Sequence, residues 1–427
     1  MLIFTPSVLL ALILPYAVSG ESFPQTSAAS TASLPPCVQE CGVKILTAFQ
    51  CMPQDPCYCN DAQLSKALTS CVMSTCAFGD QLKAAKYRAD SCGAPIRNRS
   101  HPTRLAAPIL FAAAIAFVIA RMLSRYPALS GAGYKADDYV VLLLVIPTIA
   151  MFVVSHYTLK HGSGQDVWEL SPDTVITYMK WFLAGQVAYF MVVFGTKLSL
   201  ALLYLRIWPP FEGRTLFHWT CYVVATMLIY AVIVSCTTVT MACRPIAAYW
   251  DLRLKAQASC LDSTKLHYGF ATVNLTLDLV LLIMPIPRIL RLRVSLPRKL
   301  GLLATFAIGA LVTACSVFRI YLLKLTAYTT NPTYDFSPAG LLGVIELNAS
   351  VITCCMPATA GLARRFWGKG IQPLWSSLHS LKSSDDRTAS NTSTVDSTTS
   401  WSIEKTSDAK YIRPTVPIPM PYRAASH

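Results

Sequence analysis

Seven long apolar stretches constrain the fold of this chain more than any other feature of its sequence. Each approaches the roughly 20 residues that a helix needs to cross about 30 Å of hydrocarbon at about 1.5 Å per residue. Only 14% of the 427 residues are charged, whereas soluble domains carry about 25%, so a soluble globular fold is excluded. The predicted spans are 105–123, 139–159, 180–205, 218–240, 268–288, 300–322 and 340–360, with six spans as the alternative.

The connectors between these spans differ in charge, and this difference predicts their orientation. Connector 289–299 is basic and holds no acidic residue, whereas connector 160–178 holds one lysine and three acidic residues. Short connectors rich in Lys and Arg face the cytoplasm. The net charge of +14 therefore indicates membrane topology rather than a nucleic-acid site. Seven spans then place the N-terminal side outside the cell and the C-terminal tail in the cytoplasm.

Composition divides the chain into five segments. An apolar run followed by small residues predicts a signal peptide, with an uncleaved anchor as the alternative. We predict an all-α membrane protein: a seven-transmembrane helix bundle with a small disulfide-rich helical extracellular N-terminal domain and a disordered cytoplasmic tail. The segments are a signal peptide at 1–20, a flexible leader at 21–34, a cysteine-rich domain at 35–95, the helix bundle at 104–362 and a Ser/Thr-rich tail at 363–427.

Cysteines are concentrated in the N-terminal domain, where eight occur within one short segment. Behind a secretory signal such a set predicts four disulfides, each contributing about 2–4 kcal/mol, with zinc binding as the alternative. Their spacing does not reveal the pairing. A further pair is predicted in an outside connector, with two unpaired thiols as the alternative. The predicted disulfide cysteines are Cys37, Cys41, Cys51, Cys57, Cys59, Cys71, Cys76 and Cys92 in the domain, and Cys243 and Cys260 in the connector.

The pattern of the eight cysteines resembles the CFEM domain of fungal extracellular membrane proteins, over about residues 35–95. The resemblance implies a compact helical domain, which in some members binds haem through an aspartate between the third and fourth cysteines. Asp55 lies in this interval, one residue later than in the haem-binding members. Two interpretations follow: Asp55 is a haem iron ligand, or its side-chain oxygen caps a helix or turn. No cofactor is required by the rest of the sequence.

Four segments of the membrane region, "GAGYKADDYV", "KLSLALLYLRIW", "CRPIAAYW…C" and "MPIPRILRL", occur in that order. Together they resemble the fungal seven-helix receptor-like family, also called the fungal rhodopsin-like domain or pathogenesis-related G-protein-coupled-receptor-like proteins, over about residues 105–365. Its members commonly carry a CFEM domain. The resemblance implies a sensor at the fungal plasma membrane, associated with host-surface or nutrient sensing and infection. The seventh span has no lysine, so a retinal Schiff base cannot form there.

The predicted function is therefore the sensing of an extracellular ligand and signalling through a heterotrimeric G protein. A membrane-tethered haem- or iron-binding protein is the alternative, and a transporter is a third hypothesis. We do not expect an enzyme, because the sequence lacks a metal-ligand cluster, a nucleophile elbow and a phosphate loop. The candidate contacts for the G protein are Arg206, Arg291, Arg293, Arg298 and Lys299.

Ionisable residues within spans are costly, and they usually face the interior of a bundle. Asp278 and Glu346 are either ligand or switch contacts or structural hydrogen-bond partners between helices. Lys180, Lys197 and Arg319 are expected to extend toward the membrane surface. Leu205 precedes Arg206, so the acidic-Arg-aromatic triplet of many G-protein-coupled receptors is missing. The sequon at Asn98 is predicted to be glycosylated.

Overall fold

The computed structural model describes residues 34–129, 131–209, 215–290, 296–327 and 329–359. Five features predicted from the sequence lie outside these residues: the signal peptide, nearly all of the leader, the Ser/Thr-rich tail, and the candidate contacts Arg291 and Arg293.

The N-terminal domain consists of four helices joined by disulfides. Helix α4 begins where the Asp61 side chain accepts hydrogen bonds from two backbone amides of the first turn, Gln63 N at 2.7 Å and Leu64 N at 3.2 Å. The helices are α2 (Pro36–Ala48), α3 (Pro56–Asn60), α4 (Ala62–Thr75) and α5 (Phe78–Ser91). The disulfides are Cys37–Cys76, Cys41–Cys71, Cys51–Cys57 and Cys59–Cys92. All eight predicted cysteines are therefore paired.

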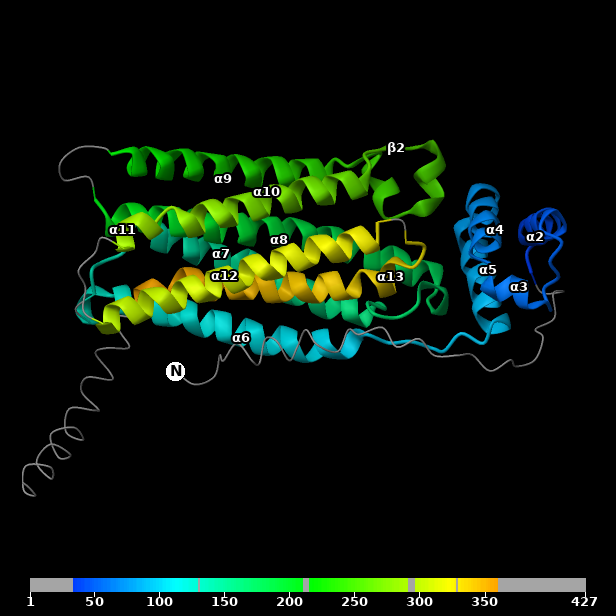
Figure 1. The fold of residues 1–427 in the computed structure, drawn as a ribbon, viewed down its shortest axis with the longest axis horizontal. Helices are drawn as coiled ribbons and strands as arrows, with labels where there is room; N and C mark the ends of the chain where they lie inside the picture. Colours follow the sequence, from blue (N-terminus) through cyan, green and yellow to red (C-terminus); the bar gives the residue numbers. More distant parts are fainter. Residues whose placement is uncertain (1–33, 130, 210–214, 291–295, 328, 360–427) are drawn as a thin grey trace, which may run out of the picture. The chain divides into compact units, whose positions relative to one another are not determined.

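Seven helices of the described chain are long and apolar enough to cross a membrane, as the sequence predicts. They lie side by side and alternate in direction (Figure 1). We call the end where α6 begins the domain end, and the end where α6 finishes the tail end. The spans are α6 (Ser100–Arg125), α7 (Ala136–Lys160), α8 (Pro172–Ile207), α9 (Leu216–Thr240), α10 (Ser263–Ile283) with α11 (Ile286–Leu290), α12 (Leu296–Leu325) and the seventh helix (Pro332–Thr359), whose first turn is α13 (Pro332–Asp335).

The connectors contain short helical turns and one small sheet. Strands β1 (Cys243–Arg244) and β2 (Ser259–Cys260) pair in antiparallel register, with Cys243 opposite Cys260. These two cysteines form the fifth disulfide, as predicted. The remaining turns are η3 (Pro127–Leu129), η4 (Val167–Glu169), η5 (Ile246–Tyr249) and η6 (Leu252–Gln257).

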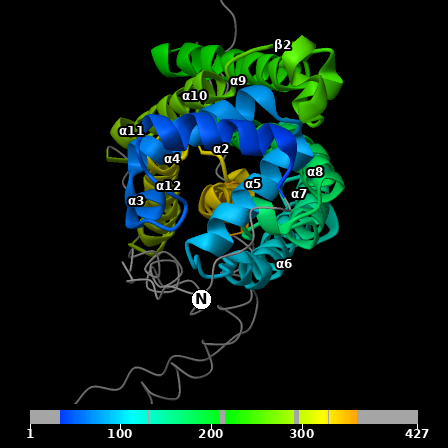
Figure 2. The same ribbon diagram turned by 90° about the vertical axis from the view of Figure 1, so that its right-hand side faces the viewer.

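Helix α8 and the seventh helix form the centre of the bundle. They are the two most buried spans, and Figure 2 shows the seventh helix surrounded by the others. Val192, Phe194 and Leu347 belong to the main apolar core. Outer helices instead expose large apolar side chains such as Ile146 and Tyr230, which is the surface that lipid covers. Polar side chains in the middle of these two helices, such as Lys197 and Glu346, are therefore buried in protein.

Candidate functional site

Glu346 is the centre of a buried polar network in the middle of the bundle. It lies on the seventh helix, and its side chain is 1% exposed. Its carboxylate accepts four hydrogen bonds, two at each oxygen. The donors are Tyr189 Oη at 2.9 Å and Arg319 Nη1 at 2.8 Å to Oε2, and Asn274 Nδ2 at 2.8 Å and Ser316 Oγ at 2.6 Å to Oε1. One carboxylate therefore joins the seventh helix to α8, α10 and α12.

An ion pair between α8 and α10 extends this network. Lys197 Nζ lies 3.1 Å from Asp278 Oδ1 and donates to Asn274 Oδ1 at 2.7 Å. The second carboxylate oxygen of Asp278 is buried and has no hydrogen-bond partner among the described residues. We call Tyr189, Lys197, Asn274, Asp278, Ser316, Arg319 and Glu346 the central network. Its two acidic and two basic side chains balance in charge.

The expectation that Lys197 and Arg319 extend to the membrane surface is wrong. The Lys197 side chain is 4% exposed and the Arg319 side chain 15%, and each pairs with a carboxylate of the central network. A partner carboxylate at the same depth offsets the cost of burying a cation. The structural interpretation of Asp278 and Glu346, as partners between helices, therefore holds in this structure, and their role as ligand or switch contacts stays a prediction.

A second ionic cluster lies at the tail end, where α6, α7 and α8 meet. Arg121 is fully buried and donates to Asp137 Oδ2 at 2.6 Å and to Asp138 Oδ1 at 2.8 Å. Its Nη1 also donates to the backbone oxygen of Cys354, on the seventh helix, at 2.6 Å. Arg206 closes the cluster from α8, with Nη1 2.6 Å from Asp138 Oδ2. We call Arg121, Asp137, Asp138 and Arg206 the tail-end cluster.

The sequence suggested Arg206 as a contact for a G protein without an acidic partner beside it. In the structure its side chain is 9% exposed, pairs with both aspartates of α7, and donates to the backbone oxygen of Gly133 at 2.6 Å. The acidic partner is therefore present but comes from another helix. The motifs "GAGYKADDYV" and "KLSLALLYLRIW", far apart in the sequence, meet at this cluster.

At the domain end, Asp166 joins three segments of the chain. It lies in the connector between α7 and α8, where it accepts from Arg97 Nη2 at 2.7 Å and from Asn331 Nδ2 at 2.7 Å. Burial alone would lower the pKa of Arg97, but the hydrogen bond and the charge of Asp166 outweigh burial and raise this pKa. The guanidinium also lies 4.2 Å from the ring centroid of Tyr334. The linker before α6 is therefore attached to the start of the seventh helix.

Gly164 makes this junction sterically feasible. Its φ of +88° is unfavourable for other residues, and a Cβ there would lie 2.6 Å from the backbone nitrogen of Ser100. Arg99 N donates to Gly164 O at 2.8 Å, and Gly164 N donates to Thr333 O at 2.8 Å. A glycine is therefore required where the connector passes between α6 and the seventh helix.

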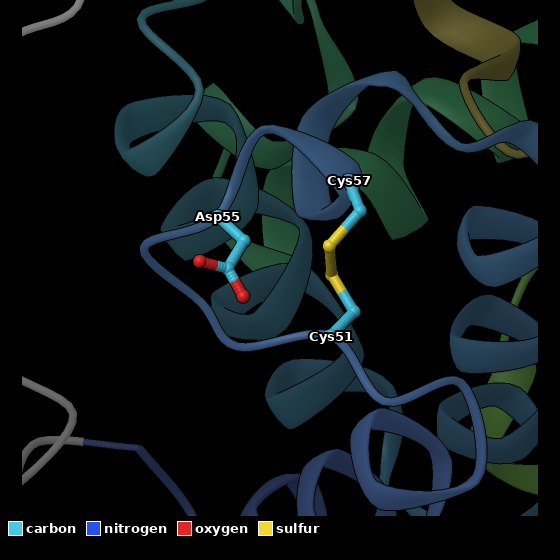
Figure 3. A group of neighbouring side chains, drawn as sticks. All are labelled: Cys51, Asp55 and Cys57. Atoms are coloured by element: carbon cyan, nitrogen blue, oxygen red, sulfur yellow. A yellow bond between two sulfur atoms is a disulfide. The ribbon is translucent and has the colours of Figure 1, made fainter.

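Asp55 lies on the loop that the Cys51–Cys57 disulfide closes (Figure 3). Its Oδ2 accepts from Met52 N at 2.9 Å, which stabilises a turn, as one of the two interpretations predicts. Both neighbouring sulfurs are in the disulfide and cannot act as thiolate ligands, so these three residues do not form a metal cluster. Asp55 is exposed, and Met52 beside it is 69% exposed. One carboxylate beside an apolar surface is compatible with haem iron ligation.

A cavity of about 2550 Å³ opens at the domain end of the bundle. Its lining includes Tyr189 and Arg319 of the central network, and it continues onto residues of the N-terminal domain such as Tyr58. Burial raises the pKa of the Tyr58 phenol. The central network is therefore in contact with a space that is open at the domain end.

The remaining predicted residues lie at the two ends of the bundle. Arg298 and Lys299 belong to the first turns of α12. Asn98 is exposed and precedes α6 by two residues, and its glycosylation stays a prediction. Sequence reasoning missed Arg121, which is fully buried, and Asp166, which is 2% exposed. The signal for Arg121 was an arginine near the end of an apolar helix that is followed by the paired Asp137 and Asp138.

Comparisons with known proteins identify two domains. The fungal rhodopsin domain family matches residues 120–365, and the CFEM domain family matches residues 30–93. No solved structure matches the chain.

Three curated relatives come from different fungi. An SAT4 family membrane protein of Emericella nidulans is 29% identical over 49% of this chain and 52% of its own length. Fugralins biosynthesis cluster protein 2 of Gibberella zeae is 24% identical over 44% and 48%. Receptor GIN3 of Arthrobotrys oligospora is 24% identical over 58% and 59%. The chain thus spans about half the length of the curated relatives it matches.

The match to the fungal rhodopsin domain covers more than half of the chain and includes all seven spans except the first part of α6. The CFEM match covers the four-helix domain with its four disulfides. The chain therefore belongs to the fungal rhodopsin domain family of multi-pass membrane proteins and carries an N-terminal CFEM domain.

Proposed function

We propose that this protein is a cell-surface receptor that senses an extracellular ligand at the domain end and signals to a heterotrimeric G protein at the tail end. The observation that carries the proposal is the central network, which joins four helices below a cavity that opens at the domain end. A relative whose name describes it as a receptor supports the same role. The proposed role is sensing rather than catalysis.

Disulfide positions support an orientation with the domain end outside the cell. Four disulfides lie in the CFEM domain, which leads into α6, and the Cys243–Cys260 disulfide follows α9, which also finishes at the domain end. Disulfides form in oxidising compartments. The free cysteines of the described chain lie in the spans instead. We therefore propose a plasma-membrane protein with its C-terminal side in the cytoplasm.

Signalling can be tested with the basic connector at the tail end. Replacing Arg291, Arg293, Arg298 and Lys299 together with Gln removes the positive charge of this connector. We expect the cyclic AMP response of fungal cells on a hydrophobic surface to fall to that of cells lacking the chain, with unchanged surface display. A cyclic AMP response equal to that of the unmodified chain contradicts G-protein coupling through this connector.

The matched control neutralises two exposed basic residues at the domain end, Arg253 and Lys265, whose side chains are 61% and 85% exposed. Changing both to Gln should leave surface display and the cyclic AMP response unchanged. A loss of response in this control as well would show that total charge, and not the position of the connector, determines the output.

Haem binding by the CFEM domain is a second proposal, favoured by the exposed Asp55 beside Met52. The CFEM family is associated with haem binding. Full-length protein in lipid nanodiscs is titrated with haemin, with empty nanodiscs as the reference. We expect a Soret shift that Asp55→Ala removes and Asp90→Ala, an exposed carboxylate on α5, retains. A shift that survives Asp55→Ala excludes this ligand.

A further inference from the structure

Six aromatic side chains line one part of the cavity inside the bundle. They come from α8, from the connector after β1 and from the seventh helix, and Phe182 and Phe336 stack with their ring centroids 5.9 Å apart. Aromatic faces favour apolar ligands, because they bury a large area at a low cost in side-chain entropy. These six residues are Tyr178, Phe182, Tyr189, Phe190, Tyr249 and Phe336, and Trp168 and Tyr268 line the cavity as well.

The charged residues that line the cavity favour an anion. Among the described residues, three arginines and two aspartates line it, and Arg319 alone of these arginines lies within a membrane span. The Arg319 side chain is 15% exposed, whereas its partner Glu346 is 1% exposed and does not line the cavity. A molecule in the cavity therefore meets the guanidinium, while the neutralising carboxylate lies behind it.

Among the described residues Arg319 donates one hydrogen bond, and its guanidinium carbon lies 4.2 Å from the ring centroid of Tyr189, so other N–H donors are left for such a molecule. Its Nη1 donates to Glu346 Oε2 at 2.8 Å, and a guanidinium carries five N–H donors in a planar fork that matches a carboxylate. Gln186, a neutral amide that also lines the cavity, donates a hydrogen bond to Tyr249 Oη at 3.0 Å. Arg319 is therefore the residue of the spans that offers a charged donor group to a molecule in the cavity.

Gly340 leaves space for the body of such a ligand. This residue of the seventh helix lines the cavity, and a Cβ there would meet no atom within 4 Å. Three residues further along, a Cβ on Gly343 would lie 4.0 Å from Cε2 of Tyr189. The volume of about 2550 Å³ includes the part of the cavity that the N-terminal domain lines, and sites for drug-sized molecules measure roughly 300–1,000 Å³. An elongated molecule can therefore lie along the seventh helix.

We propose that the cavity binds an elongated apolar molecule with a terminal carboxylate, which pairs with Arg319. This inference rests on the proposed receptor function and specifies the class of its ligand. The ligand carboxylate and Glu346 then both pair with Arg319. Glu346 also accepts hydrogen bonds from Tyr189, Asn274 and Ser316. Binding therefore changes the balance of hydrogen bonds between α8, α10, α12 and the seventh helix.

Direct binding tests the proposal without any signalling readout. The probe is 11-(dansylamino)undecanoic acid, compared with the corresponding alcohol, on full-length protein in lipid nanodiscs. Trp168 lines the cavity and can transfer excitation energy to the bound dansyl group. We expect saturable energy transfer with the acid that empty nanodiscs do not show, and about tenfold to a hundredfold weaker binding of the alcohol. Equal binding of acid and alcohol would overturn the proposal.

Two variants locate the probe. Gly340→Leu should weaken acid binding about tenfold or more by filling the cavity, whereas Gly269→Leu should not. A Cβ on Gly269, in α10, would also meet no atom within 4 Å, but this residue does not line the cavity. The double variant Arg319→Gln with Glu346→Gln removes both charges together and should abolish the preference for acid. Unchanged binding in Gly340→Leu, or a retained preference in the double variant, overturns the site.

The outcomes separate this inference from the receptor proposal. Specific acid binding by a chain that gives no cyclic AMP response leaves the ligand site standing and contradicts the receptor function. A cyclic AMP response from a chain that does not bind the acid contradicts the ligand class alone.

Discussion

The substitution Glu346→Gln tests the central network most directly. It converts one acceptor oxygen into an NH₂ group that faces two donors, and it leaves the charge of Arg319 without its counter-ion. Removing one partner of a buried ion pair costs about 3–5 kcal/mol. At about 2 °C per kcal/mol for a large domain, Tm should fall by about 6–10 °C.

Thermal unfolding in lipid nanodiscs measures this change. A thiol-reactive fluorophore reports unfolding, because the free cysteines Cys221, Cys315, Cys354 and Cys355 are buried in the folded chain. Unfolding exposes these thiols, so the fluorescence rise marks Tm. The measurement needs no ligand and no signalling partner.

Two comparisons make the result decisive. Asp173→Asn removes a carboxylate whose side chain is 91% exposed and should change stability by less than about 0.5 kcal/mol. Combining Glu346→Gln with Arg319→Met should recover part of the loss, because no unpaired charge remains. A Tm for Glu346→Gln within about 2 °C of the unmodified protein would refute the view that this carboxylate is ionised and holds the helices together.

Three further predictions use the same assay. Replacing Cys243 and Cys260 together with Ser removes a disulfide of sequence separation 17 and should lower the free energy of unfolding by about 3 kcal/mol. An unchanged Tm would contradict a stabilising role for this disulfide. Gly164→Ala should cost about 1–3 kcal/mol from backbone strain, whereas Gly42→Ala, in a helix with open space around it, should raise stability slightly; equal effects would refute the steric reasoning. Arg121→Met should lower the free energy of unfolding by about 3–5 kcal/mol, since two buried carboxylates lose a cation, and an unchanged Tm would contradict a stabilising role for this arginine.

The number of spans, the cysteine domain and the connector disulfide could be predicted because each depends on a local pattern. Apolar length determines whether a helix can span the membrane, and both Cys243 and Cys260 lie in one short connector. The bounds of the helices were less predictable. Helix α8 begins at Pro172, well before the predicted 180, because Pro172 occupies its first turn and Ser171 caps it.

The ionic partners could not be predicted, because they depend on how distant helices are packed. Arg206 and Asp138 are 68 residues apart, and Arg319 and Glu346 are 27 apart. Hydropathy places each residue along its own helix but says nothing about the rotation of that helix against its neighbours. The expected extension of Arg319 to the surface failed for this reason.

The charge balance of the central network has a consequence for how the chain is made. Helices α8, α10 and α12 enter the membrane before the seventh helix is synthesised, and each charged residue at mid-membrane costs about 2.5–3.5 kcal/mol on insertion. Arg319 acquires its counter-ion only when Glu346 arrives. Synthesis of the seventh helix therefore converts an assembly with an unpaired cation into a neutral one. A bundle that lacks this helix keeps an uncompensated charge, which distinguishes it from a correctly completed one.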